Sequence, residues 1–299
     1  MRIVTFLLLT FFGQTLSCQI LDNYQGKLYS GECIFNEDFI KQNNIKTIIG
    51  SISVKSEMQP IRSLGTLDMY TFNRSGKLIE HLNSFKLRGG RIDTTQDFYQ
   101  YNDLEHLVSV MSYDLSGYDA SSFEYDAEGN LKKEVFLRGE NKSPYSKQIE
   151  KGKETVLKSE TFEFELVNDS TKKKIYINSA GKPYKETVIT YNRLDQKKSE
   201  STTFYLTNKK SMITYQYDVQ GRLEKIHDFS NLLGNLTITY TYEYDEYGNL
   251  YSSKVYKDGK LTYSKEFIYH VQTFLLKAQL TKDEERNEIK IIQYEYGYY

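Results

Sequence analysis

The feature that most constrains the fold is one short motif that recurs along the chain, an aromatic residue followed by a turn. Three copies are nearly the same: FEYDAEGNL at 123–131, YQYDVQGRL at 215–223 and YEYDEYGNL at 242–250. They share the pattern aromatic-x-Tyr-Asp-x-x-Gly-[Asn/Arg]-Leu. Weaker copies include YTFNRSGKL at 70–78 and VITYNRLDQK at 188–197. A motif that returns at a near-constant spacing indicates a repeat architecture.

The second aromatic residue of each copy gives the length of the repeat. These residues are Phe72, Tyr101, Tyr125, Phe164, Tyr191, Tyr217, Tyr244, Tyr269 and Tyr296. They are about 26 residues apart, as in a solenoid-like repeat, except for 39 residues between Tyr125 and Phe164. Further turn signals, such as R-G-G at 88–90 and K-D-G-K at 257–260, fall between them. Each unit is therefore predicted to be a long β-hairpin. The long interval predicts either an irregular connection around Pro144 or one extra strand.

The turn motif has a structural explanation. In D-x-x-G the Asp carboxylate accepts a hydrogen bond from the amide two residues later, which starts a type I turn. The Gly adopts the left-handed conformation that closes the loop. Asn168 and Asp195 stand where Gly is expected, and both residue types tolerate a positive φ, whereas Thr273 fits this place badly. A structural turn role is thus predicted for the following residues: Asp126, Gly129, Asp218, Gly221, Asp245 and Gly248.

The strand pattern predicts an all-β fold. In LTITYTYEY at 236–244, Ile238 and the tyrosines point to one face, and the threonines and Glu243 to the other. The 27 Tyr, 16 Phe and only 3 Pro of the chain suit such strands. We expect a long antiparallel meander of repeated β-hairpins. A flat sheet of this size would leave its aromatic face wet, so a curled or spiralling single sheet is predicted.

An outer-membrane barrel is another way to hide an aromatic face. Charged residues on nearly every strand and a mean hydropathy of −0.60 argue against it. We divide the chain into a signal peptide (1–17), an N-terminal segment or cap (18–47) and the β-hairpin repeat domain (48–299). The cap is expected to contain a short helix near Glu37–Gln42.

The N-terminus has the pattern of an export signal. Arg2 is followed by an apolar run at 3–12, about half the length that spans a bilayer. The tripeptide L-S-C at 16–18 resembles a bacterial lipobox, although Thr15 stands where a branched aliphatic residue is usual, and this predicts that Cys18 carries a lipid anchor. The alternative is ordinary cleavage, with Cys18 and Cys33 paired in a disulfide. Either way the protein is expected in the bacterial cell envelope, as an outer-membrane lipoprotein or as a periplasmic or secreted protein.

Charge and motifs exclude several classes of function. The 39 basic and 40 acidic side chains give a net charge of −1, which argues against a nucleic-acid partner and against a polybasic lipid-binding patch. Contact with a membrane is therefore expected only through the anchor. The four histidines are scattered and no carboxylate pair stands out, so no catalytic residue, metal site or cofactor is predicted.

The segment Y-D-V-Q-G-R-L at 217–223, and the copies at 125 and 244 that follow it with Asn for Arg, resemble the YD repeat of Rhs and teneurin-like proteins. The resemblance implies strand-turn-strand units that coil into a continuous β-sheet on secreted or surface-attached chains. Such repeats are described as carbohydrate-binding or as shells around a toxin. Because the repeats run to Tyr299, a short form without a toxin domain is expected.

These observations predict a binding or scaffolding module for a carbohydrate or an envelope protein, without catalysis. Tyr247 and Tyr251 are the candidate ligand-binding residues, because an aromatic ring on a solvated position can stack on the apolar face of a sugar. The alternatives are an immunity-like or assembly protein that binds a partner through a sheet edge, and a secreted hydrolase.

Overall fold

The computed structural model describes residues 19–31, 33–114, 116–143 and 150–299, which form 18 β-strands and three short helices. The helices are η1 (Tyr24–Gly26), α1 (Lys27–Ser30) and α2 (Glu37–Gln42). The strands are β1 (Ile45–Ser56), β2 (Arg62–Phe72), β3 (Leu78–Lys86), β4 (Ile92–Tyr101), β5 (Leu107–Asp114), β6 (Gly117–Tyr125), β7 (Leu131–Asn141), β8 (Lys151–Asn168), β9 (Thr171–Ile177), β10 (Pro183–Tyr191), β11 (Lys197–Phe204), β12 (Lys210–Tyr217), β13 (Leu223–Ser230), β14 (Leu236–Tyr244), β15 (Leu250–Lys257), β16 (Lys260–Tyr269), β17 (Leu276–Asp283) and β18 (Glu288–Tyr298).

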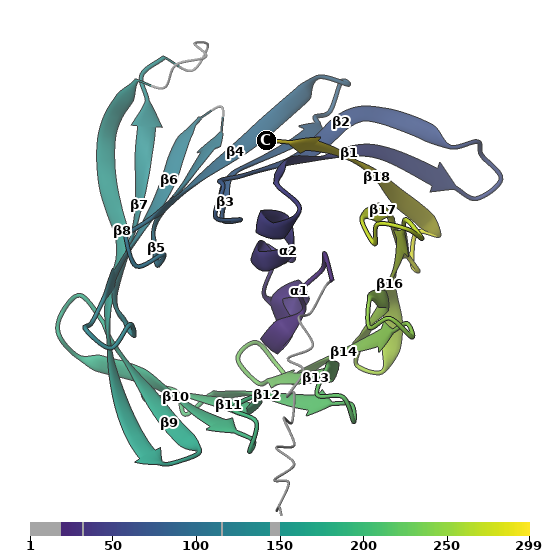
Figure 1. Cartoon of the computed structure of the whole chain (residues 1–299). Helices are drawn as coiled ribbons and strands as arrows, with labels where there is room; N and C mark the ends of the chain where they lie inside the picture. Colours follow the sequence, from purple (N-terminus) through teal and green to yellow (C-terminus); the bar gives the residue numbers. More distant parts are fainter. Residues whose placement is uncertain (1–18, 32, 115, 144–149) are drawn as a thin grey trace, which may run out of the picture.

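The strands form one antiparallel sheet that closes into a barrel (Figure 1). Each strand pairs with the next along the chain, and β1 pairs with β18 over its length, with Ile48 opposite Tyr296 and Ile52 opposite Ile292. The all-β antiparallel meander is thus confirmed, but the expectation of a curled or spiralling open sheet is wrong. An open sheet leaves unpaired N–H and C=O groups along its two outer edges, and closure pairs them.

The D-x-x-G segments form the turns at one end of the barrel. The Oδ1 atoms of Asp126, Asp218 and Asp245 each accept a hydrogen bond from the amide two residues later, at 3.1, 2.9 and 3.0 Å. The three glycines have φ angles of 81°, 81° and 88°. Among the degenerate copies, Asp195 has φ 57° and takes the place of the glycine. Asn168 instead accepts from the amide of Ser170.

The repeated tyrosine has a role that the pattern did not predict. The hydroxyl of Tyr269 donates to the carbonyl oxygen of Leu250 at 2.6 Å, and Leu250 is the first residue of β15, in the preceding hairpin. The same hydrogen bond, to the first residue of the second strand in the preceding hairpin, is made by Tyr101, Tyr125, Tyr217, Tyr244 and Tyr296. The motif therefore joins consecutive units as well as forming a turn.

The long interval between Tyr125 and Phe164 is occupied by one extended hairpin. Strands β7 and β8 pair directly, with Asn141 opposite Lys151, and β8 alone has 18 residues. The described residues of this interval contain no extra strand, whereas the alternative of an irregular connection around Pro144 lies outside the described residues. Figure 1 shows this hairpin projecting beyond the ring.

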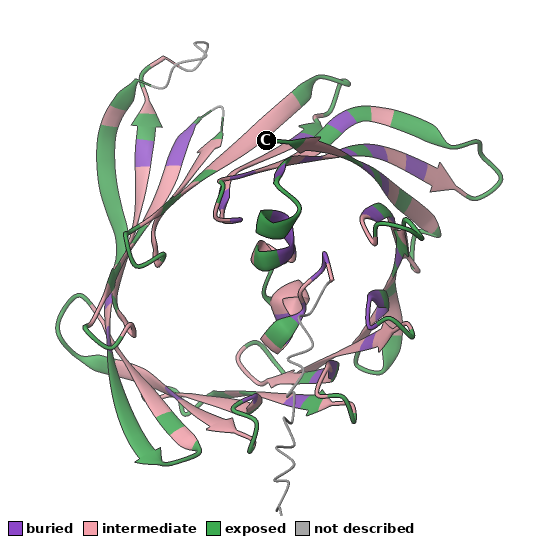
Figure 2. Ribbon diagram, viewed as in Figure 1, coloured by how far each residue is buried: buried purple, intermediate pink, exposed green. Residues whose placement is uncertain are grey.

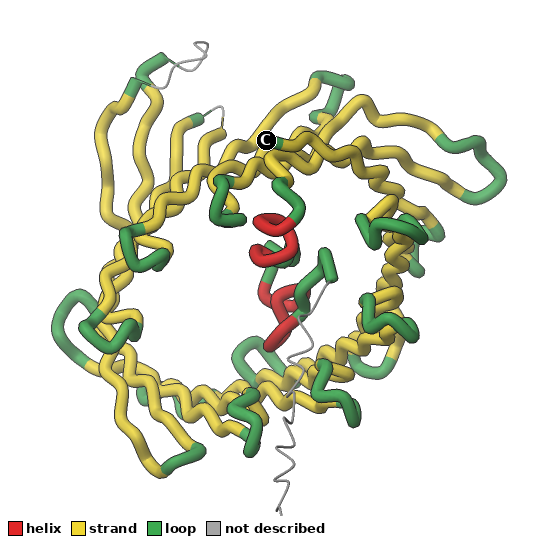
Figure 3. Tube along the Cα trace, in the orientation of Figure 1, coloured by secondary structure: helices red, strands yellow, loops and turns green. Residues whose placement is uncertain are grey.

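The segment of residues 19–44, here called the plug, lies inside the barrel and does not cap one end of it (Figure 3). Helix α2 covers Glu37–Gln42, as expected, and begins after Asn36, whose side chain accepts from the amides of Asp38 and Phe39. Ile20, Phe35 and Ile40 are buried in one cluster with residues of the wall. Figure 2 shows buried positions on the plug. The wall residues of this core are Ile45, Ile48, Ile52, Phe72, Leu78, Tyr215, Leu223, Ile226, Tyr242, Leu250, Phe267, Leu276, Ile292 and Tyr294.

Contacts with the plug identify the inner face of the wall. The Tyr29 ring of the plug lies edge-on to Tyr240, with ring centroids 4.8 Å apart. Because side chains alternate along a strand, Tyr242 also points inward, while Thr239 and Thr241 point outward. The aromatic face of β14 therefore lines the inside of the barrel, and the outer face of this strand is polar.

A candidate binding pocket between the plug and the barrel wall

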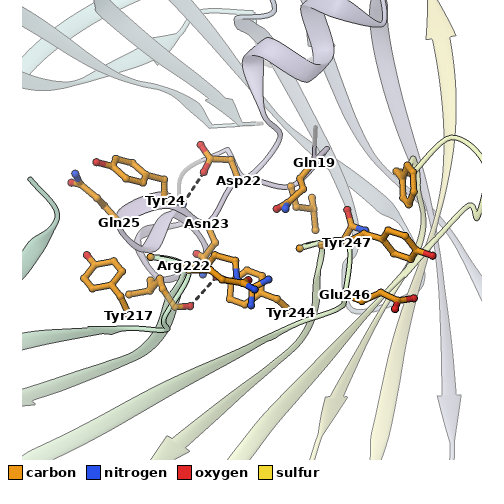
Figure 4. Close-up of a pocket in the computed structure, with 17 residues that line it drawn as sticks. Gln19, Asp22, Asn23, Tyr24, Gln25, Tyr217, Arg222, Tyr244, Glu246 and Tyr247 are labelled. Carbon is orange, nitrogen blue, oxygen red and sulfur yellow. Dashed lines mark hydrogen bonds between the residues drawn. The ribbon is translucent and has the colours of Figure 1, made fainter. Parts of the chain in front are cut away.

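A cavity of about 710 Å³ lies where the plug meets the turns after β12, β14 and β16 (Figure 4). Drug-sized ligands typically occupy pockets of about 300–1,000 Å³. The plug contributes Gln19, Leu21, Asp22, Asn23, Tyr24 and Gln25. The wall contributes Tyr217, Gln220, Gly221, Arg222, Leu223, Tyr244, Glu246, Tyr247, Gly248, Asn249 and Phe274.

Aromatic rings occupy two sides of the pocket. Tyr247, which is 66% exposed, packs against Phe274 with the ring centroids 5.3 Å apart. On the plug side, Tyr24 is 54% exposed. Burial raises the pKa of both Tyr217 and Tyr244 to about 12, so their hydroxyls stay protonated at neutral pH. These rings offer flat apolar surfaces with hydroxyl groups at their edges.

One cationic side chain, that of Arg222, belongs to the pocket lining. The Arg222 guanidinium lies 4.6 Å from the centroid of the Tyr244 ring, and its Nε donates to Oδ2 of Asp218 at 2.7 Å. Burial alone would raise the pKa of Asp218, but hydrogen bonds from the backbone and side chain of Arg222 outweigh it and lower the pKa. The pair is therefore ionised at neutral pH. A guanidinium has five N–H donors in a rigid plane, which suits recognition of neighbouring oxygen atoms.

Side-chain amides complete the lining. Asn249 is buried, and its Nδ2 donates to Oδ2 of Asp245 at 3.0 Å. Asn23 is 7% exposed, and its Oδ1 accepts from the amide of Leu28 at 3.1 Å. The Nδ2 of Asn23 has no hydrogen-bond partner among the described residues. This amide is therefore an unsatisfied polar group in the lining, and an unpaired buried donor costs roughly 1–3 kcal/mol.

The plug needs a particular backbone to reach the pocket. Gln25 and Gly26 have φ angles of 53° and 87°. A Cβ at Gly26 would lie 2.8 Å from Cδ1 of Ile226, so this position requires glycine for both conformation and space. Next to it, the hydroxyl of Tyr29 donates to Oδ2 of Asp228 at 2.9 Å. These contacts hold η1 and α1 against the wall beside the pocket.

The structure separates the residues that the sequence singled out. Tyr247 lines the pocket, together with Gly221 and Gly248. Tyr251 lies on the outer face of β15, where its hydroxyl donates to Oε2 of Glu243 at 3.0 Å, so it does not share a site with Tyr247.

The remaining predicted residues lie elsewhere. Asp126 and Gly129 belong to the turn between β6 and β7, which is not part of the pocket lining. Cys18 lies outside the described residues, and with it the predicted anchor and the alternative disulfide. Cys33 is half-buried and forms no disulfide within the described residues, and burial raises its pKa to about 11.

Two further features bear on the possible chemistry. The described part of the chain has no group of three or more His, Cys, Asp or Glu side chains that could hold a metal ion. Within the same residues, no helix is long and apolar enough to cross a membrane. Sequence reasoning missed Tyr24 and Arg222 as pocket residues, because only the position of the plug inside the barrel brings them together.

No family model matches the sequence, and no curated protein matches it significantly. Among solved structures, a porin-like protein from Bacteroides uniformis is 13% identical, with coverage of 85% of this chain and 97% of that chain and a TM-score of 0.38. A porin-like protein from Bacteroides vulgatus is 9% identical, with coverage of 83% and 97% and a TM-score of 0.35. A LolA superfamily protein from Nitrosomonas europaea is 11% identical, with coverage of 85% and 88% and a TM-score of 0.18. Similarities this low carry no argument, so strand pairing alone defines the barrel, and the resemblance to YD repeats stays a prediction.

Proposed function

We propose that this chain is an exported, lipid-anchored envelope protein of a bacterium that binds a carbohydrate in the pocket between the plug and the wall. Catalysis is not part of this proposal. The observation that carries it is the composition of the pocket, in which the exposed rings of Tyr24 and Tyr247 stand beside Arg222, Glu246 and Asn249. Rings can stack on the apolar faces of a sugar, while guanidinium, carboxylate and amide groups bind its hydroxyls.

The outer face of the barrel favours attachment through a lipid anchor over a barrel wall that spans the bilayer. A strand that faces lipid needs apolar outward side chains. On β14 the outward residues are instead Thr237, Thr239, Thr241 and Glu243. Other charged residues on the outer face are Glu124, Glu163, Lys173, Lys225, Lys254 and Glu266. With such strands in its wall, the barrel would be held at the membrane by a lipid on Cys18 and would not span the bilayer.

Two tyrosine variants test the sugar site. The protein is screened on a glycan array, and the affinity for the strongest hit is measured by calorimetry. Tyr247→Ala should weaken binding at least tenfold, which is about 1.4 kcal/mol, because it removes an exposed ring of the pocket. Tyr251→Ala is the matched control, since this ring lies on the outer face. Equal affinity of the Tyr247 variant and the wild type would exclude the pocket as the sugar site.

The lipid anchor is tested separately. Cells are grown with radiolabelled palmitate, and the protein is recovered from the membrane fraction. The wild type should be labelled and Cys18→Ala should not. Labelling that persists in the variant would show that Cys18 is not the acylated residue.

A second candidate function, partner binding through a sheet edge, is favoured by the projecting hairpin. Strand β8 pairs with β7 from Lys151 onward but with β9 only from Thr161 onward. Residues 151–160 therefore have a free edge, on which Val156 and Leu157 are 60% and 59% exposed. A free edge can accept a strand from another protein.

Loss of a partner from membrane extracts tests this second function. The double change Val156→Lys and Leu157→Lys should abolish capture of a partner by the anchored protein. Ile268→Lys, at an exposed apolar position on β16, is the control. If the double variant still captures the partner, the free edge of β8 is not the binding site.

A further inference from the structure

The described chain begins at Gln19, one residue after the proposed anchor residue Cys18. Gln19 lines the pocket, and its side-chain amide is so close to Gly248 that a Cβ there would collide with it. Gly248 belongs to the turn between β14 and β15. The described chain therefore begins beside this turn. An acyl chain on Cys18 would therefore emerge at the barrel end that carries the D-x-x-G turns.

Four consecutive turns around this point each present an exposed apolar side chain. These residues, here called the apolar arc, are Leu194, Val219, Tyr247 and Val271, which are 71%, 104%, 66% and 89% exposed. They belong to the turns after β10, β12, β14 and β16, which are neighbours in the barrel. Exposed apolar side chains grouped in this way mark an interaction surface.

The charges on these turns indicate which kind of lipid surface the arc can bind. The four turns contain two cationic residues, Arg193 and Arg222, and four anionic residues, Asp195, Asp218, Asp245 and Glu246. Arg222 is paired with Asp218. An arc with a small negative charge gains nothing from anionic lipids, which attract Lys and Arg clusters. A zwitterionic lipid surface carries no such penalty.

We infer that the apolar arc is a membrane-docking surface, which rests on the leaflet that holds the acyl chains of Cys18. This inference depends on the proposed lipid anchor. Acyl chains and inserted apolar residues act together in membrane binding, and both lie on one side of the barrel here. Because Tyr247 belongs to both the arc and the pocket, docking places the pocket beside the leaflet.

The opposite end of the barrel provides the comparison. Leu206 and Leu233 lie in the turns after β11 and β13 and are 94% and 102% exposed. They are as apolar and exposed as the arc, but antiparallel strands place them at the far end from Gln19. Exposure alone therefore does not distinguish the two ends, whereas the position of the anchor does.

Fluorescence quenching by lipid tests this orientation. The full-length acylated protein with Cys33→Ser is given one new cysteine, Val219→Cys or Leu233→Cys, at two almost fully exposed positions. A fluorophore on that thiol is measured in phosphatidylcholine vesicles with brominated acyl chains. We expect the fluorescence at position 219 to be quenched and that at position 233 to be unchanged. Equal quenching at both positions, at neither, or only at 233 would overturn the docking surface.

Two additional measurements separate this inference from the proposed function. Palmitate labelling shows whether the anchor exists. If the protein is acylated and position 219 is not quenched, the docking surface fails while the anchor stands. If the protein is not acylated, the anchor and the docking surface fail together, and the sugar site is still tested by Tyr247→Ala.

Added phosphatidylglycerol should not increase quenching at 219, and an increase would contradict the charge argument.

Discussion

At the scale of single residues, the repeated tyrosine hydroxyl joins one hairpin to the next. Tyr269 is outside the pocket lining and donates to the carbonyl of Leu250. Tyr269→Phe removes this hydrogen bond and should lower the free energy of unfolding by about 1 kcal/mol, since the carbonyl loses its partner. Urea denaturation measures the change. Tyr251→Phe is the control, because its hydroxyl bonds the exposed Glu243 carboxylate, and an equal loss there would contradict a special role for the repeated tyrosine.

The inner wall also contains a residue that makes stability depend on pH. Nε2 of His81 is 2.7 Å from Asp68 and its Nδ1 is 3.4 Å from Asp97, while its ring stacks on Tyr70 at 4.4 Å. Burial alone would lower the pKa of His81, but the hydrogen bonds to the two carboxylates outweigh it and raise the pKa to about 9. The imidazole is therefore protonated in the folded protein at neutral pH.

The direction of the pH effect follows from this shift. A raised pKa of His81 in the folded state stabilises the protein fully below the unfolded value of about 6.5, and this contribution is lost as pH rises to about 9. The free energy of unfolding should fall by on the order of 2–3 kcal/mol over that range. Urea denaturation of the wild type and His81→Gln at pH 6, 7.5 and 9 measures it. The same pH slope in both proteins would show that His81 is not the titrating group.

At the scale of secondary-structure elements, Gly248 connects a wall turn to the plug. Its φ is 88°, and a Cβ would collide with the Gln19 amide. Gly259 in the turn between β15 and β16 has nearly the same φ, 82°, with open space around it. Gly259→Ala should therefore cost about 1 kcal/mol from backbone strain alone.

Gly248→Ala has the same backbone strain and also disturbs the plug. It should cost about as much stability as Gly259→Ala, because the Gln19 amide is the end of a flexible side chain that can move aside, but it should weaken sugar binding, since the displaced Gln19 lines the pocket. Denaturation and calorimetry on the two variants separate strain from contact. If both variants keep the sugar affinity of the wild type, the pocket does not depend on this contact.

At the scale of the whole molecule, closure depends on strands at the two ends of the chain. Ile45 in β1 pairs with Tyr298 in β18, so the seam cannot form until almost the whole chain has been synthesised. Removal of residues 288–299 deletes β18 and leaves β1 and β17 with free edges, which favours aggregation. Size-exclusion chromatography should show aggregates of this variant. Removal of Tyr299 alone deletes only two hydrogen bonds, to the carbonyl oxygens of Phe72 and Asn44, and should leave a monomer-sized peak. A monomeric protein without β18 would contradict the importance of the seam.

Local patterns in the sequence determined the elements of this protein. Alternation of Tyr and Thr predicted strands such as β14, the D-x-x-G spacing predicted its turns, and the short helix near Glu37–Gln42 is α2. These features depend on neighbouring residues, so the sequence contains them directly. Only the tertiary structure decided that β1 meets β18, that the plug lies inside, and that Tyr247 and Tyr251 are on different surfaces. Each of these depends on contacts between residues far apart in the chain, such as Tyr29 with Asp228, which no local pattern specifies.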